Sequence, residues 1–294
     1  MNIRLQSRPG LVEIILRSLI VGFVYSLASA LAAFILGPLS RLAPTLDNLV
    51  VWLFTGTLVC LSLSPFILHS DSSRIKTIMA VWGVQALVRS LGLGIEGSLF
   101  KPTAALNAVV GAVSGILVSL LVAWLAVRLL MPVDQIPHEN ADRGRSGWSW
   151  ACRVLLVGIA YFLFYFVFGA TNALLYTRSF YENNPQYGLS LPPTGMIFLA
   201  QLIRGPLFGL GSLFIVRATN APRRPLAVRL GILLFVIGGV GPYVEVTFRT
   251  MPLEFNLATL TEIFLQNFLT GLVAVHLLGS KNIPPTLIAA GNTR

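Results

Sequence analysis

The sequence has 294 residues, of which 55% are hydrophobic and 11% are charged, and its net charge is +10. A soluble domain carries about 25% charged residues, so this composition excludes a water-exposed surface over most of the chain. The apolar residues stand in blocks of about 20, the length of a helix that crosses a lipid bilayer. The alternating pattern of a membrane β-barrel is absent, which leaves helices as the spanning elements.

Eight apolar blocks predict eight transmembrane helices, so the predicted fold is an all-α, polytopic membrane helix bundle. In chain order the blocks are Ile14–Gly37, Leu49–His69, Thr77–Gly97, Ala104–Leu130, Cys152–Tyr176, Gly195–Val216, Ala227–Val246 and Asn256–Leu278. The first block follows Arg4 and Arg8, as the apolar part of a signal peptide would. Its apolar stretch is longer than the usual length of about 7–15 residues, so we expect it to be retained.

The basic residues predict how the chain is oriented. With a cytoplasmic N-terminus, 15 of the 21 Lys and Arg residues lie on the cytoplasmic side and 4 on the other side, and Arg89 and Arg204 lie within the membrane. Cytoplasmic loops collect basic residues, so both termini are predicted to be cytoplasmic in a multi-pass protein of the cell membrane. The lipid bilayer then accounts for the positive charge, and no nucleic-acid partner is expected.

The two halves of the chain resemble each other in sequence order. The matches are Arg17 with Arg153, Gly22 with Gly158 and Tyr25 with Tyr161 at an offset of 136, Pro44 with Pro193, Gly56 with Gly205 and Glu96 with Glu245 at 149, and Ala126–Leu130 with Ala274–Leu278 at 148. Four helices per half is an even number, so both halves enter the membrane in the same direction. We therefore predict two parallel four-helix repeats, residues 1–131 and 151–294, joined by a cytoplasmic linker over residues 132–150.

The offset grows by 13 residues between the fifth and sixth blocks because the outer connection of the second half is longer. The extra length lies within Tyr176–Pro192 and carries Phe180, Tyr181 and Tyr187. Two interpretations stay open. The aromatic residues anchor the connection at the depth of the lipid headgroups, or the connection is a lid over an outward-facing cavity.

Small residues repeat at intervals of four in several blocks. Gly111 and Gly115 form such a row in the fourth block, and Gly205 and Gly209 form one in the sixth. Rows of this kind let two helix backbones approach closely. They serve either as packing surfaces within the bundle or as faces through which a homo-oligomer forms.

Polar side chains within the apolar blocks are the candidate functional residues. A charged side chain in hydrocarbon costs about 2.5–3.5 kcal/mol on insertion scales, so each one needs a partner or a wet cavity. The candidates for a substrate-binding site are Arg89, Arg204, Gln85, Gln201 and Glu262. Glu96 and Glu245 occupy matching positions of the two repeats, and we interpret them as structural polar residues of the common fold.

The spacing of these residues predicts two polar stripes. Gln85, Arg89 and Glu96 share one face of an α-helix, and Gln201 and Arg204 are neighbours on another. Stripes that face each other would line a cavity with positive charge and amide groups. The alternative is a buried structural ion pair of Arg204 with either Glu245 or Glu262.

No pattern in the sequence predicts catalysis, a metal or a cofactor. The His-Glu-x-x-His, Gly-x-Ser-x-Gly and Gly-x-x-x-x-Gly-Lys motifs are absent, and Asp47, Asp71, Asp134 and Asp142 lie in or beside loops. Two functions stay open. The first is a small-solute transporter or permease with a midplane polar site, for which the arginines suggest an anionic solute. The second is a non-transporting membrane subunit or assembly scaffold.

Single cysteines test the predicted orientation, in a variant whose Cys60 and Cys152 are replaced by serine. A Tyr181→Cys variant should react with an impermeant thiol reagent in intact cells, because this position is predicted to lie outside. An Arg223→Cys variant should react only after the cells are opened. The reverse labelling pattern would overturn the orientation.

Overall fold

The computed structural model describes residues 9–40, 45–100, 105–132, 146–187, 191–246 and 251–279. Within these ranges eight helical spans are long and apolar enough to cross a membrane, which confirms the all-α, multi-pass bundle. Five of the eight are built mainly from one α-helix each, and these helices are α1 (Leu11–Ser40), α2 (Leu46–Leu68), α5 (Ala105–Leu130), α8 (Thr194–Ala218) and α11 (Leu253–Leu278).

The third, fifth and seventh spans are composite and contain π-helical turns. Their segments are α3 (Arg74–Val84), η1 (Gln85–Leu91) and α4 (Gly92–Phe100), then α6 (Gly147–Asn172), η3 (Ala173–Thr177) and α7 (Arg178–Asn183), then α9 (Arg223–Phe235), η5 (Val236–Val240) and α10 (Gly241–Val246). A short 3-10 helix, η4 (Pro185–Tyr187), follows α7. π-Helical turns are rare and occur often at functional sites.

Several helices begin where a hydroxyl side chain caps the first turn. The Thr45 Oγ1 atom accepts a hydrogen bond of 3.3 Å from the backbone N–H of Asn48 at the start of α2. Ser146 Oγ accepts one of the same length from Ser149 at the start of α6. These bonds satisfy backbone donors that have no partner inside the helix. Helix α6 therefore begins at Gly147, within the segment 132–150 that we assigned to the linker.

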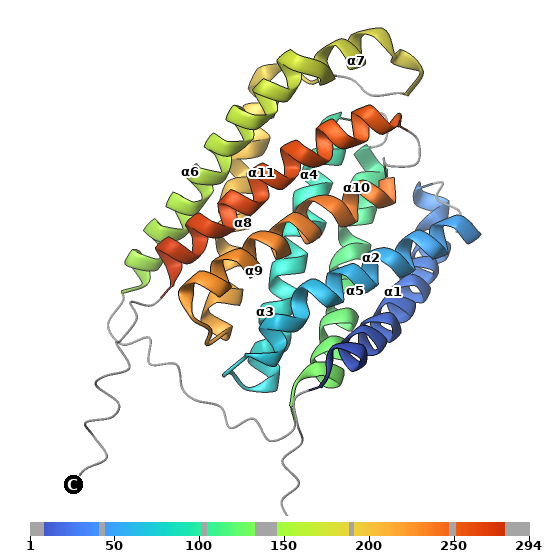
Figure 1. Cartoon of the computed structure of the whole chain (residues 1–294). Helices are drawn as coiled ribbons and strands as arrows, with labels where there is room; N and C mark the ends of the chain where they lie inside the picture. Colours follow the sequence, from blue (N-terminus) through green and yellow to red (C-terminus); the bar gives the residue numbers. More distant parts are fainter. Residues whose placement is uncertain are drawn as a thin grey trace, which may run out of the picture.

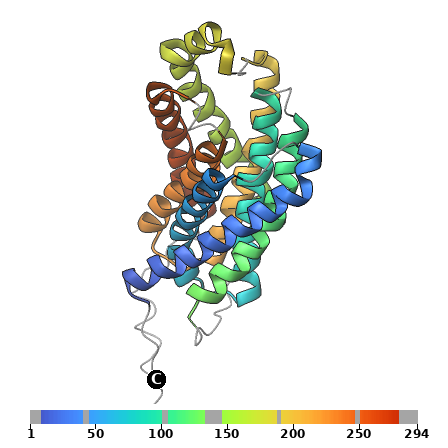
Figure 2. The same cartoon turned by 90° about the vertical axis from the view of Figure 1, so that its right-hand side faces the viewer.

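The helices pack as two groups that meet along the middle of the molecule. In the first half α1 packs on α2 and α5, and in the second half α6 packs on α8 and α11. The groups join where α3 runs along α8 and where α2 contacts α9 and α10. Figure 1 shows the first group at the right and the second at the left, and Figure 2 shows the same bundle from the side.

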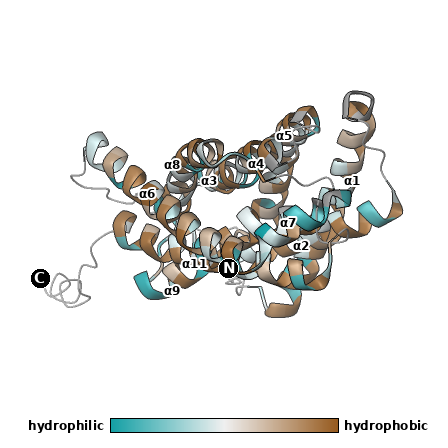
Figure 3. Cartoon of the chain, turned by 90° about the horizontal axis from the view of Figure 1, so that it is seen from above, coloured by the Kyte–Doolittle hydropathy of each residue, from teal (hydrophilic) through white to brown (hydrophobic). Residues whose placement is uncertain are grey.

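The start of α1 and the end of α11 lie at the same end of the bundle, as an even number of spans requires (Figure 1). The view from above shows mostly hydrophobic residues on the outer helices (Figure 3). The most apolar window of the first span is 22% buried and that of the fifth is 17% buried, against 56% for the third and 61% for the sixth. The spans that carry Arg89 and Arg204 are therefore central in the bundle.

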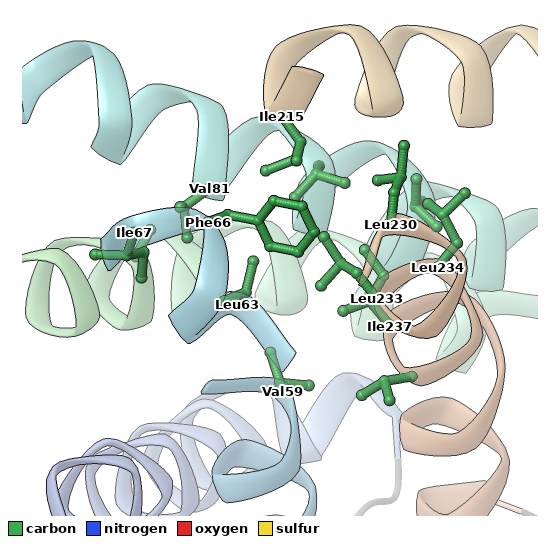
Figure 4. Packing of buried hydrophobic residues seen from close by; sticks show 14 of the residues in the cluster. Val59, Leu63, Phe66, Ile67, Val81, Ile215, Leu230, Leu233, Leu234 and Ile237 are labelled. Atoms are coloured by element: carbon green, nitrogen blue, oxygen red, sulfur yellow. The ribbon is translucent and has the colours of Figure 1, made fainter. Parts of the chain in front are cut away.

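An apolar core fills the contact between the two groups of helices (Figure 4). It consists of fully or almost fully buried side chains from α2, α3, α8, α9 and η5, among them Val59, Leu63, Phe66, Ile67, Val81, Ile215, Leu230, Leu233, Leu234 and Ile237. Lipid tails are as apolar as leucine, so water-driven burial contributes little to helix association in a membrane. Close van der Waals packing of these side chains contributes instead.

Contacts of the first half recur in the second half at the offsets found in the sequence. The Arg17 side chain donates to the carbonyl oxygen of Leu129, and its counterpart Arg153 donates to that of Leu277. In the same way Gly22 lies close to Thr57, and its counterpart Gly158 lies close to Pro206. The π-helical turns match as well, because an offset of 149 places η5 over the second part of η1. Superposition of the two complete halves stays a prediction, which these contacts support.

One contact joins two residues that are counterparts of each other. Ser70 and Thr219, separated by the offset of 149, form an isolated antiparallel bridge after α2 and after α8. The Asn220 N–H donates to the carbonyl oxygen of His69 beside it, at 3.1 Å. A residue that contacts its own counterpart lies on a twofold axis. The bridge is therefore where an axis between parallel repeats would pass.

The glycine contacts predict a difference in stability between two alanine variants. A Cβ atom added at Gly205 would lie 2.5 Å from the carbonyl oxygen of Gly158, whereas one added at Gly111 would meet nothing within 4 Å. Gly205→Ala should therefore separate α6 from α8 and cost about 1–3 kcal/mol by overpacking. Gly111→Ala should leave stability unchanged or raise it, because alanine favours helix. Thermal unfolding in detergent measures both, and equal midpoints for the two variants would contradict this packing.

Candidate functional site

The interior of the described structure contains two ion pairs, and each pair joins the two halves. Arg89 Nη2 lies 2.7 Å from Glu245 Oε1, which links the third span to the seventh. Arg204 Nη2 lies 2.9 Å from Glu96 Oε2, which links the sixth span to the third. Both guanidinium groups therefore have a carboxylate partner within the bundle.

The first cluster consists of Arg89, Glu245 and Tyr25. The Tyr25 hydroxyl donates to Glu245 Oε1 at 2.8 Å and accepts a hydrogen bond from Arg89 Nη2. Arg89 Cζ also lies 4.7 Å from the centre of the Tyr25 ring, a cation–π distance. The Arg89 and Glu245 side chains are 7% and 13% exposed, so the two charges neutralise each other in an almost closed setting.

The second cluster is built around Arg204 and is larger. Gln201 Oε1 accepts hydrogen bonds of 3.2 Å from Arg204 Nη1 and from the Tyr161 hydroxyl. Tyr161 stacks on Phe208, with 4.2 Å between the ring centres, and its ring lies 5.7 Å from Arg204 Cζ. The Glu96 side chain is 34% exposed, whereas that of Arg204 is 4% exposed. Glu96 is therefore the more exposed partner of this ion pair.

Polar atoms of the second cluster remain without a partner in the described residues. Gln201 is fully buried and its Nε2 atom donates to nothing, and the same holds for the Nε atom of Arg204. Leaving a buried donor unpaired costs about 1–3 kcal/mol. The chain's own described groups thus do not satisfy this cluster.

The two clusters share a tyrosine and a glutamate at matching positions of the repeat, Tyr25 with Tyr161 and Glu245 with Glu96. The arginine differs, because it comes from the third span in one cluster and from the sixth in the other. Thr55, the counterpart of Arg204, is buried and its hydroxyl has no partner among the described residues. Positions that match in the sequence therefore carry different chemistry in the two halves.

The structure contains the buried ion pair of Arg204 that one interpretation expected, but the partners suggested for it are wrong. Arg204 pairs with Glu96 and not with Glu245 or Glu262. Arg89 and Glu96 belong to different ion pairs, so the predicted stripe of the third span is divided between two clusters. Between them lies the end of η1, whose wider π-helical turns rotate the chain less per residue than the α-helix on which the spacing argument depended.

The structure separates Gln85 from both ion pairs. Its Nε2 atom donates to the Val81 carbonyl at 3.2 Å, and its Oε1 atom has no partner in the described residues. The side chain is 1% exposed. Gln85 is therefore a buried amide of the third span that bonds mainly to its own helix.

Glu262 lies in a third polar region, between α6 and α11. Its Oε2 atom accepts a hydrogen bond of 2.6 Å from Asn172 Nδ2. A Cβ atom added at Gly169 would lie 3.1 Å from Glu262 Oε1 and 3.8 Å from Tyr165 Cε1, so the carboxylate and this ring both lie close to the backbone of Gly169. No cationic side chain among the described residues forms an ion pair with Glu262.

The long connection between the fifth and sixth spans folds back onto α11. Phe180 and Tyr181 of α7 lie with their ring centres 4.4 Å and 6.0 Å from that of Phe255, and Phe180 also stacks on Tyr187 at 5.4 Å. Figure 1 shows α7 above the N-terminal end of α11. Phe255 precedes Glu262 by about two helical turns on α11. The aromatic residues thus contact the bundle on the side of Glu262.

Some members of this site were not singled out from the sequence. Tyr25 and Tyr161 were matched as repeat residues, and that shared position was the signal that could have marked them. Asn172 gave no signal, because it stands near the end of an apolar block. Among the described residues no group of three or more His, Cys, Asp or Glu side chains is placed to hold a metal ion.

Comparisons with models of protein families, with curated proteins and with solved structures give no significant match to this chain. The interpretation of the site therefore depends on its own geometry. That geometry brings Gln201 and Arg204 together, places Glu262 beside Tyr165, and assigns Arg89 to a separate cluster.

The first ion pair predicts a non-additive pattern of stabilities. Arg89→Met and Glu245→Met should each lower the unfolding free energy by about 3–5 kcal/mol, because each leaves one charge buried and unpaired. The double variant should be clearly more stable than the sum of the two losses, since it removes both charges. Thermal unfolding in detergent of the four proteins completes the cycle. Additive losses would show that the two side chains do not act as a pair.

Proposed function

We propose that this chain is a membrane transporter or permease for a small solute, with its substrate site in the second half, around Arg204, Gln201 and Glu262. The observation that carries the proposal is the set of unpaired polar groups in that region. Gln201 Nε2 and Arg204 Nε have no partner among the described residues, and Glu262 has no cation. Such groups are expensive within a membrane unless water or a ligand satisfies them.

The depth of these residues supports a transport site. Arg204 stands ten residues after the start of α8, and Glu262 stands nine after the start of α11. At about 1.5 Å per residue both lie roughly 15 Å from the outer helix ends. This is about half of a hydrocarbon core of roughly 30 Å. Substrate sites of secondary transporters lie at that depth.

The asymmetry between the halves also supports it. Gln201, Glu262 and Gln266 correspond, at the offsets of the repeat, to Trp52, Ser114 and Val118. Polar groups required by a common fold would occur in both halves. Groups present in one half only are better explained by a solute that binds there.

A second candidate function is a non-transporting subunit or scaffold, and one observation favours it. Arg89 and Arg204, which the sequence suggested as the binding groups for an anionic solute, are both paired with carboxylates across the halves. In that case the ion pairs hold the bundle together and no solute is needed to balance the arginines. The free carboxylate of Glu262 is the feature that this alternative does not explain.

Uptake into proteoliposomes tests the proposal with two matched variants. A panel of amines, amino acids, organic acids, sugars and inorganic ions is compared with protein-free liposomes. Gln201→Met removes the fully buried amide of the second cluster and should reduce uptake of the transported solute at least about tenfold, the effect of losing one hydrogen bond to a ligand. Gln85→Met removes an equally buried amide outside both ion pairs and should leave uptake unchanged.

Two controls decide between the candidates. Both variants should unfold within a few degrees of the unmodified protein, so that lost uptake reports on binding rather than on folding. Uptake equal to that of protein-free liposomes for the whole panel would reject transport of these solute classes and favour the scaffold.

A further inference from the structure

The charges of the described interior do not cancel in the second half. In the first cluster Arg89 balances Glu245. In the second, Arg204 balances Glu96, and Glu262 remains as a carboxylate without a cation among the described residues. The binding region therefore has no unpaired arginine, and its unpaired acidic group is Glu262, the opposite of what the two arginines suggested.

The surroundings of Glu262 leave one of its oxygen atoms available. Asn172 donates to Oε2, and no described side chain donates to Oε1. Gly169 lets the backbone of α6 approach Oε1 closely, because a Cβ atom at this position would lie only 3.1 Å from that oxygen. A side chain at position 169 would therefore crowd Oε1.

Two tyrosine rings lie on the face of α6 beside this carboxylate. Tyr165 contacts the same point at Gly169, and Tyr161 lies one turn earlier on α6. Tyrosine rings beside a carboxylate form the environment that binds alkylammonium groups through cation–π and charge attraction. A hard metal ion needs several oxygen ligands instead, and no group of three acidic, His or Cys side chains is present in the described residues.

A second observation comes from buried polar atoms next to the same rings. Gln201 is 0% exposed and holds Tyr161 through its Oε1 atom, while its Nε2 atom has no partner among the described residues. Arg204, 3% exposed and beside Tyr161, likewise has an unpaired Nε. Both donors lie beside Tyr161, one turn from Tyr165 on α6, and no described residue satisfies them.

We infer that the region of Glu262, Tyr161 and Tyr165 binds an organic ammonium cation, with the Glu262 carboxylate as its counter-ion and the tyrosine rings beside its alkyl groups. The inference rests on the proposed function, because it names the chemical class of the transported solute. It also predicts that Asn172 orients the carboxylate through Oε2 and leaves Oε1 to the ligand.

Tetramethylammonium is the probe, added to the purified full-length protein in detergent and compared with sodium chloride at equal ionic strength. A ligand that binds the folded state raises the unfolding midpoint, here by about 2 °C or more at saturation. Glu262→Gln keeps the shape of the side chain and removes its charge, so the half-saturating concentration should rise at least about tenfold. Glu254→Gln alters an exposed carboxylate of the same helix and should respond like the unmodified protein.

Three results would overturn the inference. They are the absence of a tetramethylammonium shift in the unmodified protein, an equal shift in Glu262→Gln, and a sodium chloride shift, relative to buffer alone, as large as that of tetramethylammonium. Uptake measurements test the transport proposal independently of ammonium binding. Ammonium binding that needs Glu262 without uptake of any amine supports the site and rejects transport. Uptake that needs Gln201 without ammonium binding supports transport and rejects the site.

Discussion

The structure depends on the neutralisation of charge inside a bilayer. Arg89 and Arg204 both lie buried at depth, and each finds its carboxylate on the opposite half of the chain. Either half alone would contain unpaired charges, whose cost in hydrocarbon is several kcal/mol per group. Because an unpaired charge is so costly there, the two crossed ion pairs favour the arrangement in which the helix faces that carry them meet.

The crossed pairs also explain the difference between the two halves. Matched contacts, such as Arg17 on Leu129 and Arg153 on Leu277, give both halves one framework. Within it Arg89, Tyr25 and Glu245 satisfy one another in one cluster, whereas the cluster of Arg204 keeps unpaired donors on Arg204 and Gln201 among the described residues. This difference is consistent with a single binding region around Arg204.

The spans and the burial of the two arginines could be predicted from the sequence, because hydropathy and the cost of a charge in hydrocarbon depend only on local composition. The partners of the two arginines could not. The Arg204 to Glu96 contact depends on how the third span crosses α8, and the π-helical turn at Gln85–Leu91 changes which face each residue occupies. Composition does not predict side-chain hydrogen bonds either. The bond from Asn172 to Glu262 could therefore not be predicted from a residue at the end of an apolar block.

The central claim is that the two halves face each other across an axis that passes between Ser70 and Thr219. A Ser70→Cys, Thr219→Cys variant without other cysteines, and with a protease site inserted between residues 133 and 145, measures this contact directly. Opposed residues of an antiparallel pair have Cα atoms about 4.5–5.5 Å apart, within reach of a disulfide. After mild oxidation in membranes and cleavage, the account predicts that the halves stay linked on a non-reducing gel and separate on reduction. Separation without reduction, or equal linkage when the second cysteine replaces Thr194 at the far end of α8, would contradict it.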